Sequence, residues 1–292
     1  MNPKERIFIV NNIKLPVDAS FKEAFSVARG RAKSVGITDA ENFKIYRRST
    51  DARKRDSVSF VYSVSFTSYS SVNEGRLSKY DIVCRQDNEF PRLVPGDEAL
   101  EAPPVVVGSG PCGLFCALLL AENGYKPIVL ERGGSVKERL AATERFKKTR
   151  ILDTETNIQF GAGGAGTFSD GKLVTRINDS LCSYVLSRFV EFGAPEEILY
   201  IAKPHIGTDI LAGIVDSMLT RIEELGGRVL YNTRFENARL IGSRAVGVET
   251  VGGELNAGAV VLAIGHSARD TYKSLIEKGF ALEAKSFSVG MR

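Results

Sequence analysis

Two different patterns of apolar and polar residues divide the chain near residue 100. In the first part, short alternating runs predict strands over residues 7–10, 43–46 and 57–66. Ser20 followed by Glu23 predicts a capping box for a helix that ends near Val35. The stretch from Gln86 to Pro104 holds four prolines and a glycine, and predicts a linker.

In the second part, short apolar runs alternate with helical segments, which is typical of an α/β fold. Strands are predicted over residues 105–107, 128–130, 229–231, 235–240, 245–250 and 260–263, with a turn at Gly252-Gly253 before the last. Helices are predicted over 111–123 and 208–225, each ended by glycine. The sequence therefore predicts an α/β protein: a small α+β domain (1–85), a linker (86–103) and a Rossmann-like domain (104–292).

Three glycines follow the predicted strand at 105–107 with the spacing of a dinucleotide-binding turn. Gly108 permits the tight turn, Gly110 lets a pyrophosphate approach the backbone, and Gly113 lets helix and strand pack closely. The helix start offers unpaired N–H groups and partial positive charge to phosphates. Glu131, at the end of the next strand, is placed to accept hydrogen bonds from an adenosine ribose. This pattern predicts a dinucleotide site without separating NAD from FAD.

A later segment resembles the two-dinucleotide-binding-domain flavoproteins. In those families a strand–turn–strand of the form G-V-x-T…G…A…V-V-L-A-x-G returns to the cofactor. Here Gly247-Val-Glu-Thr250 precedes Val260-Val-Leu-Ala-Ile-Gly265. The resemblance implies FAD as the cofactor, with Gly265 beside it and the backbone of Phe235 near adenine.

Four longer strings resemble the uncharacterised bacterial FAD-dependent dehydrogenases, also called NAD(FAD)-utilising dehydrogenases. They are Asn157-Ile-Gln-Phe-Gly-Ala-Gly-Gly-Ala-Gly-Thr-Phe-Ser-Asp-Gly-Lys-Leu173, Pro204-His-Ile-Gly-Thr-Asp209, Gly265-His-Ser-Ala-Arg-Asp-Thr271 and Ser49-Thr-Asp-Ala-Arg-Lys54. The resemblance implies an oxidoreductase that passes a hydride or electrons through FAD to or from an unidentified small molecule. In that family the chain continues further, so Phe287–Arg292 is expected to begin a strand of a substrate region, and the sequence is expected to be C-terminally truncated.

The glycine-rich string also has a direct physical interpretation. Five glycines between Gly161 and Gly171 allow the backbone to wrap a planar ring or a diphosphate with N–H donors, and a mobile lid is the alternative. Thr167, Ser169 and Lys172 are candidates for additional polar contacts.

His266 and Arg269 follow the predicted return turn and are candidates for stabilising reduced, anionic flavin. In the alternative, His266 caps a turn and Arg269 pairs with Asp270. No catalytic residue and no metal ligand is predicted. The predicted cofactor-binding residues are Gly108, Ser109, Gly110, Pro111, Cys112, Gly113, Glu131, Arg132, Gly163, Gly164, Ala165, Gly166, Thr167, Phe235, Ala263, Gly265 and His266.

Composition and charge narrow the remaining alternatives. The net charge is +4, and residues 1–56 carry 13 basic against 7 acidic residues. The basic string from Arg47 to Arg55 is a candidate for contact with nucleic acid. Asp51 within it favours the alternative, a turn with internal ion pairs. The alternating Phe60 and Tyr62 favour core packing over base stacking. A nucleic-acid-associated flavoprotein and a flavin-free NAD-binding protein stay as the less favoured alternatives.

The cysteines and the hydropathy pattern indicate a cytoplasmic protein. The four cysteines form no C-x-x-C pair, and packing of the helix explains Cys112 and Cys116 better than a redox or metal pair. The longest apolar run, Leu114 to Ala121, is far shorter than the roughly 20 residues of a membrane span, and the N-terminal residues lack a secretory pattern. Without a second G-x-G-x-x-G motif, NAD(P)H is expected to dock only transiently.

Overall fold

The chain divides into two compact units. The computed structural model describes residues 5–54, 57–85, 94, 96–168, 171–173, 175, 177 and 179–286, without the side chains of Ser180 and Thr208. One unit comprises Met1–Arg92 with Lys172–Ile206, and the other Leu93–Gly171 with Gly207–Arg292. The predicted boundaries at 85 and 103 stay predictions. The expectations for Arg55, Ser169, most of the linker and Phe287–Arg292 lie outside the described residues.

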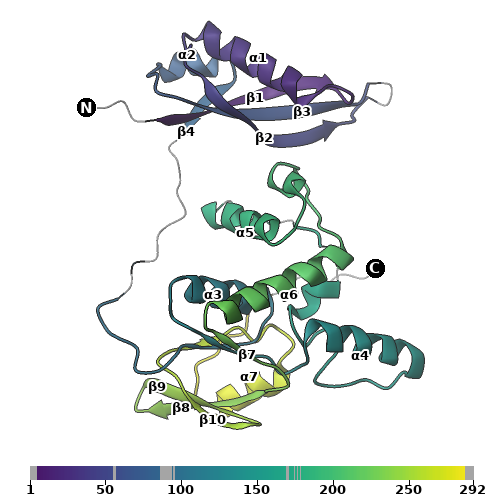
Figure 1. Cartoon of the computed structure of the whole chain (residues 1–292), viewed down its shortest axis with the longest axis vertical. Helices are drawn as coiled ribbons and strands as arrows, with labels where there is room; N and C mark the ends of the chain where they lie inside the picture. Colours follow the sequence, from purple (N-terminus) through teal and green to yellow (C-terminus); the bar gives the residue numbers. More distant parts are fainter. Residues whose placement is uncertain are drawn as a thin grey trace. The chain divides into compact units, whose positions relative to one another are not determined.

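The first unit is built on a four-stranded antiparallel sheet (Figure 1). Its elements in chain order are β1 (Arg6–Pro16), α1 (Phe21–Ser34), β2 (Glu41–Asp51), β3 (Ser59–Ser68), α2 (Glu74–Ser78) and β4 (Ile82–Arg85). The strands lie in the order β2-β3-β1-β4. A β-α-β-β-α-β chain with this strand order has the ferredoxin-like arrangement.

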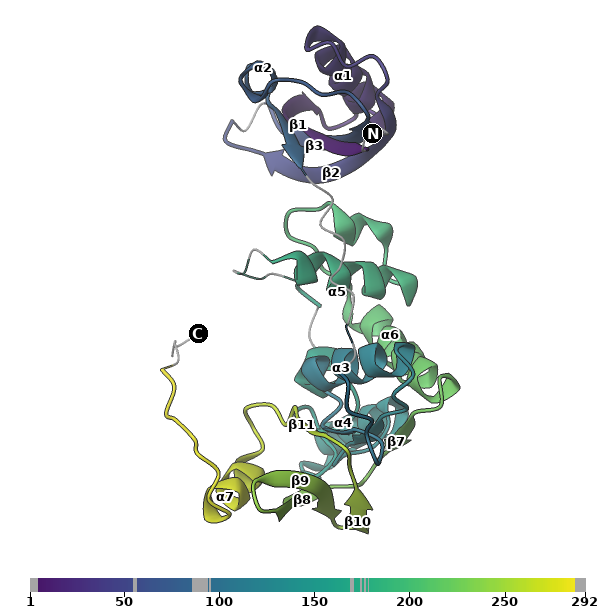
Figure 2. The same ribbon diagram turned by 90° about the vertical axis from the view of Figure 1, so that its left-hand side faces the viewer.

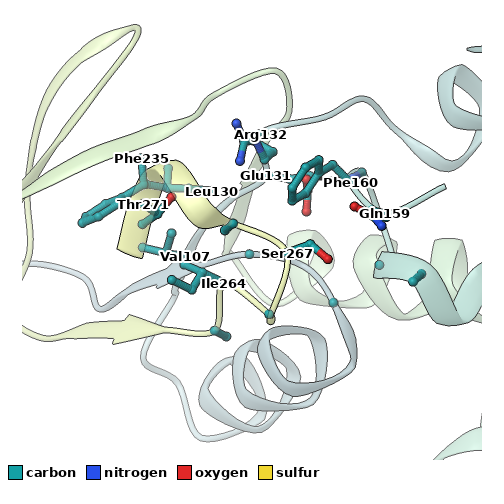
Figure 3. A pocket seen from close by; sticks show the side chains of 18 of the residues that line it. Val107, Leu130, Glu131, Arg132, Gln159, Phe160, Phe235, Ile264, Ser267 and Thr271 are labelled. Carbon is teal, nitrogen blue, oxygen red and sulfur yellow. Dashed lines mark hydrogen bonds between the residues drawn. The ribbon is translucent and has the colours of Figure 1, made fainter. Parts of the chain in front are cut away.

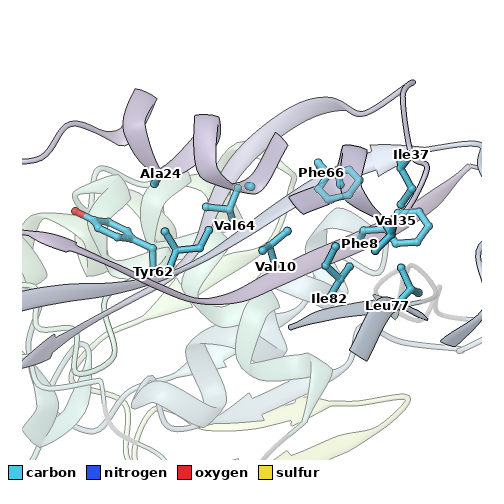
Figure 4. Packing of buried hydrophobic residues seen from close by; sticks show 13 residues of the cluster. Phe8, Val10, Ala24, Val35, Ile37, Tyr62, Val64, Phe66, Leu77 and Ile82 are labelled. Carbon is cyan, nitrogen blue, oxygen red and sulfur yellow. The ribbon is translucent and has the colours of Figure 1, made fainter. Parts of the chain in front are cut away.

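The alternation predicted over residues 57–66 is confirmed by the core of this unit. Tyr62, Val64 and Phe66 of β3 are buried on one face of the sheet, the face that α1 covers (Figure 4). The Phe66 ring stacks on Phe8 and Phe43 with centroids 5.3 and 5.4 Å away. These rings therefore pack in the core of this unit.

Strands β1 and β2 extend further than predicted. β1 continues past a bulge between Val10 and Ile13, where Asn12 has a φ of +56° and interrupts the apolar alternation. β2 includes the first half of the basic string, which was expected to be a turn, because an edge strand tolerates polar residues on its open side. The predicted ion pairs are present, since Asp51 binds Lys14 and Arg53 at 2.9 and 2.8 Å.

The segment 172–206 joins the first unit through β2, which the sequence did not indicate. It contains α5 (Ser180–Glu191) and η2 (Glu196–Leu199). The Arg48 N–H donates to the Tyr200 carbonyl at 2.6 Å, and the Arg48 guanidinium lies 5.0 and 5.5 Å from the rings of Phe60 and Tyr200. Two of the strings that resemble the dehydrogenase family, 157–173 and 204–209, also meet in this segment, because Lys172 and His205 form an isolated β-bridge.

The second unit combines a parallel and an antiparallel sheet (Figures 1 and 2). The parallel sheet has the order β11-β5-β6-β7 and the antiparallel sheet the order β10-β9-β8. The strands are β5 (Val105–Val107), β6 (Ile128–Leu130), β7 (Arg228–Leu230), β8 (Phe235–Ile241), β9 (Arg244–Thr250), β10 (Gly253–Asn256) and β11 (Val260–Leu262). The helices are α3 (Pro111–Glu122), α4 (Val136–Thr149), η1 (Gly164–Phe168), α6 (Thr208–Glu224) and α7 (Arg269–Glu277).

Alternate residues of the parallel strands face different layers of this unit. Val105 and Val107 pack in one cluster with Phe235 and Val248 of the antiparallel strands, and with Leu275 of α7. α3 packs against β5, β6 and α6. The predicted α/β fold with a Rossmann-like unit is confirmed, including the two predicted helices and the return strands.

Helices α4, α5 and α7 were not predicted. The signal that marks the start of α4 is a second capping box, in which the Glu138 carboxylate accepts from the Ser135 N–H at 2.7 Å. α4 has few apolar residues, so its hydrophobic periodicity is weak.

Asp39 makes the first unit sensitive to acid. Its carboxylate accepts hydrogen bonds from the hydroxyls of Ser70 and Ser68 and from the Tyr69 N–H, at 2.6, 2.7 and 2.9 Å, and these bonds lower its pKa to about 2. Because the pKa is depressed in the folded state, this stabilisation is present above the unfolded pKa of about 3.9 and is lost as pH falls towards 2. We expect Asp39→Asn to be less stable than the wild type at pH 6, with the gap closing between pH 4 and 2. Hydrogen exchange of the β3 amides measures the gap, and a gap that stays constant would contradict this role.

Candidate dinucleotide-binding site

The first glycine turn connects β5 to α3 with little space on either side. Gly108 has a φ of +96°, and a Cβ there would lie 2.5 Å from the Ala263 carbonyl oxygen. A Cβ on Gly113 would overlap the Gly108 carbonyl oxygen. Gly110 is different, because a Cβ there meets no atom within 4 Å. Backbone packing thus requires Gly108 and Gly113, whereas Gly110 borders open space at the helix start.

The Glu131 carboxylate fixes three loops to one another. Its side chain is buried, and one oxygen accepts from the Ser109 N–H and hydroxyl at 3.1 and 2.6 Å. The other oxygen accepts from the N–H groups of Gly133 and Gly161 at 2.9 and 3.0 Å. Glu131 therefore has a positioning role that the sequence did not reveal, and its contact with a ribose stays a prediction.

The second glycine loop packs directly on the first glycine turn. The N–H of Gly163 donates to the Ser109 carbonyl at 3.0 Å, and the N–H of Ala162 to the Gly134 carbonyl at 3.1 Å. A Cβ on Gly164 would lie 3.1 Å from the Gly110 Cα. These contacts favour an ordered loop over a mobile lid for residues 161–164.

Arg139 of α4 supports this loop from behind. Its guanidinium is fully buried and donates to the carbonyls of Asn157 and Ile158 at 3.1 and 2.8 Å, and also to the carbonyl of Ala162. It lies 4.7 Å from the centre of the Phe168 ring. Burial lowers the Arg139 pKa to about 10, and the nearby Glu131 opposes that shift, so the group is charged at neutral pH.

One pocket of about 310 Å³ lies where these loops meet the carboxyl ends of the parallel strands (Figure 3). In this view Phe235 and Thr271 lie at one end, Phe160 and Gln159 at the other, and Glu131 between them. Twelve predicted residues line it: Gly108, Gly110, Pro111, Glu131, Arg132, Gly164, Ala165, Gly166, Phe235, Ala263, Gly265 and His266.

Five predicted residues do not line this pocket. Ser109 and Gly113 are buried in the turn, and Thr167 is buried with its hydroxyl donating to the Ala162 carbonyl at 3.3 Å. Gly163 packs near Thr167 and Val215. Cys112 is exposed on the first turn of α3, so the expectation that packing explains both helix cysteines is wrong for Cys112.

An ion-pair network borders the pocket near the end of β6. Arg132 binds Glu155 at 3.0 Å and Asp270 at 2.8 Å, and lies 4.2 Å from the centre of the Phe160 ring. Arg234 binds the same Glu155 at 2.9 Å. The hydrogen bond from Arg132 lowers the pKa of Asp270. Asp270 therefore pairs with Arg132, in place of the neighbouring Arg269 suggested by the sequence.

The ion-pair network holds more acidic than basic side chains. Arg234 also contacts Glu236 at 3.4 Å, so two arginines face three carboxylates. The network therefore carries an excess of negative charge. Local sequence patterns did not indicate Arg234, Phe160, Gln159 or Thr271, because these residues meet only through the tertiary fold.

His266 Nε2 lies 3.3 Å from the Ser267 hydroxyl, and both residues line the pocket. Groups of three or more metal-ligating side chains are absent from the described part of the chain. Among the described residues, no helix is both long and apolar enough to cross a membrane.

Comparisons with known proteins agree with a nucleotide-binding fold. A family model described as an NAD(P)-binding Rossmann-like domain matches residues 106–166. A domain of unknown function, DUF8436, matches residues 9–67. The fold and the site thus define a protein that contains a Rossmann-like domain of the NAD(P)-binding type.

A curated relative covers nearly the whole chain. An uncharacterized protein of Clostridium beijerinckii (strain ATCC 51743 / NCIMB 8052) is 40% identical over 286 residues, which is 97% of this chain and 53% of that protein. This chain therefore spans about half the length of the curated relative it matches.

Solved structures show only weak similarity. Glycine oxidase from Bacillus cereus ATCC 14579 has a TM-score of 0.34 and 15% identity, covering 62% of this chain and 59% of its own. THI4 of Thermovibrio ammonificans has a TM-score of 0.41 and 17% identity, covering 63% and 64%. TM-scores this low support no argument about function.

Removing the Arg139 guanidinium should loosen the second glycine loop selectively. A buried charged donor is worth about 1.5–3 kcal/mol per hydrogen bond, so Arg139→Met should raise amide exchange at Gly163 and Gly164 by at least about tenfold. Lys137→Met on the exposed side of α4 is the matched control and should leave exchange unchanged. Equal exchange in the Arg139 variant and the wild type would show that the loop does not depend on this side chain.

Proposed function

We propose that this chain is the dinucleotide-binding part of an FAD-dependent oxidoreductase. The observation that carries the proposal is the convergence of four segments on one pocket: the first glycine turn, the end of β6, the second glycine loop and the return segment at Gly265. FAD, when bound, supplies a ring that accepts or donates a hydride or single electrons.

The residues of the pocket suit the different parts of FAD. The N–H groups of the first turn of α3 have no partner within the helix and face the open space beside Gly110, which suits a pyrophosphate. Arg132 and Phe235 border the region proposed for adenosine. Gly164, Gly166 and His266 would border the remainder of the cofactor.

In this assignment the residues around the pocket hold its loops in place and exclude water. Gly108 and Gly113 hold the strand and helix close enough for the helix start to reach the phosphates. Glu131 and Arg139 keep the second glycine loop against the first turn. The apolar side chains of Val107, Leu130 and Ile264 exclude water from the pocket floor.

A flavin-free NAD-binding protein is the second candidate. The description of the matching family model, an NAD(P)-binding domain, favours it. The excess of carboxylates around Arg132 and Arg234 then favours NAD over its 2′-phosphorylated form. From the sequence alone we also propose that the substrate is a small molecule, that NAD(P)H docks transiently and that the protein is cytoplasmic.

Replacing Gly110 tests the proposal with little risk to the fold. Gly110 has a φ of −65° and open space around its Cα, so Gly110→Leu should fold, while its side chain fills the place of the pyrophosphate. We expect the purified variant to carry less than about a tenth of the wild-type FAD, measured from visible absorption and the mass of the released cofactor.

Gly213→Leu is the matched control. Gly213 is an exposed glycine in α6 with open space around its Cα, so this variant should retain the wild-type amount of cofactor. Full FAD retention by Gly110→Leu would refute the proposed site. Release of NAD in place of FAD from the wild type would select the second candidate.

A further inference from the structure

A second cavity lies beside the dinucleotide pocket and takes no part in the proposed function. It measures about 340 Å³ and is enclosed by α4 and the segment that follows it. Gln159 and Phe160 line both cavities and separate them. A volume above about 300 Å³ is within the range of small-molecule sites.

The walls of this cavity are mainly apolar. Ala142 and Phe146 come from α4, and Leu152, Ile158 and Phe160 from the following segment. Leu152 and Ile158 are 54% and 47% exposed, so a ligand that covered them would remove apolar surface from water.

The buried polar side-chain groups of the described lining are engaged within the protein, with one exception. The Asp153 carboxylate accepts from the N–H groups of Glu155 and Thr156 at 3.0 and 2.9 Å, and binds Arg145 at 3.1 Å. The Asn157 side-chain oxygen accepts from the Gln159 N–H at 2.8 Å. Asp153 is the one charged residue among the described lining residues, so the cavity presents no charge free for an ionic ligand.

Thr143 is the exception. Its side chain is 5% exposed, and its hydroxyl finds no hydrogen-bond partner within the part of the chain that the structure describes. A buried hydroxyl without a partner is energetically costly, and a ligand with a hydroxyl or carbonyl group would satisfy it.

We propose that this cavity binds a neutral, mainly apolar small molecule that forms one hydrogen bond with the Thr143 hydroxyl. The apolar walls favour an apolar body of the ligand, the lack of a free charge disfavours ions, and the buried Thr143 hydroxyl favours a polar group beside it. The site is independent of FAD, although a ligand that displaced Phe160 would also alter the wall of the dinucleotide pocket.

A pair of probes that differ by one hydroxyl tests this proposal. p-Cresol should bind the full chain and shift the amide NMR signals of Ala142, Thr143 and Ile158, and toluene should bind the same place. Thr143→Val keeps the side-chain shape and removes the hydroxyl. It should weaken p-cresol binding about fivefold and leave toluene binding unchanged or tighter.

Two further variants test the proposal even if Thr143→Val does not fold. Leu152→Glu places a charge on the cavity wall and should weaken both probes, whereas Leu140→Glu, on an exposed α4 residue outside the lining, should weaken neither. The proposal is overturned if millimolar p-cresol leaves the three amides unshifted, or if Thr143→Val binds p-cresol as tightly as the wild type. It is also overturned if Leu152→Glu and Leu140→Glu behave alike.

Discussion

The arrangement of the site depends on one buried carboxylate. Glu131 receives four hydrogen bonds from three separate loops, so the first glycine turn, the end of β6 and the second glycine loop are held together by one side chain. A buried carboxylate is tolerated only when donors satisfy it, and three of these donors are backbone N–H groups. The positive charge of Arg139, on the other side of the loop, adds to this stabilisation.

Close packing of neighbouring segments explains why three of the glycines at the site are required. Where two backbones approach within contact distance, as at Gly108 and Gly113, a side chain has no room. Gly161 allows the Arg139 side chain to pass beneath the loop, and its φ of +115° is unfavourable for other residues. Gly110 differs from Gly108 and Gly113, because a Cβ there meets no atom within 4 Å, so this glycine leaves room for a ligand and the other two build the turn.

The sequence predicted the elements whose signals are local. The strand–glycine turn–helix at 105–122 and the return strands at 235–262 were found because periodicity and glycine spacing mark them directly. It did not reveal the contacts of Arg139 with Asn157, of Arg234 with Glu155 or of Arg132 with Phe160, which join residues 18 or more positions apart that no nearby spacing relates. The association of 172–206 with the first unit was missed for the same reason, since it depends on contacts of Tyr200 and Ile201 with the distant residues Arg48 and Phe21.

In the proposed function, two glycine segments that are far apart in the sequence form one site for FAD. Hydrogen exchange of the purified, cofactor-stripped chain with and without added FAD tests it most directly. The account predicts that FAD slows exchange together at residues 108–114, at 161–167 and at Gly265–His266. Slowed exchange at 108–114 alone, with the other two segments unchanged, would contradict it and would favour a ligand that uses only the first glycine turn.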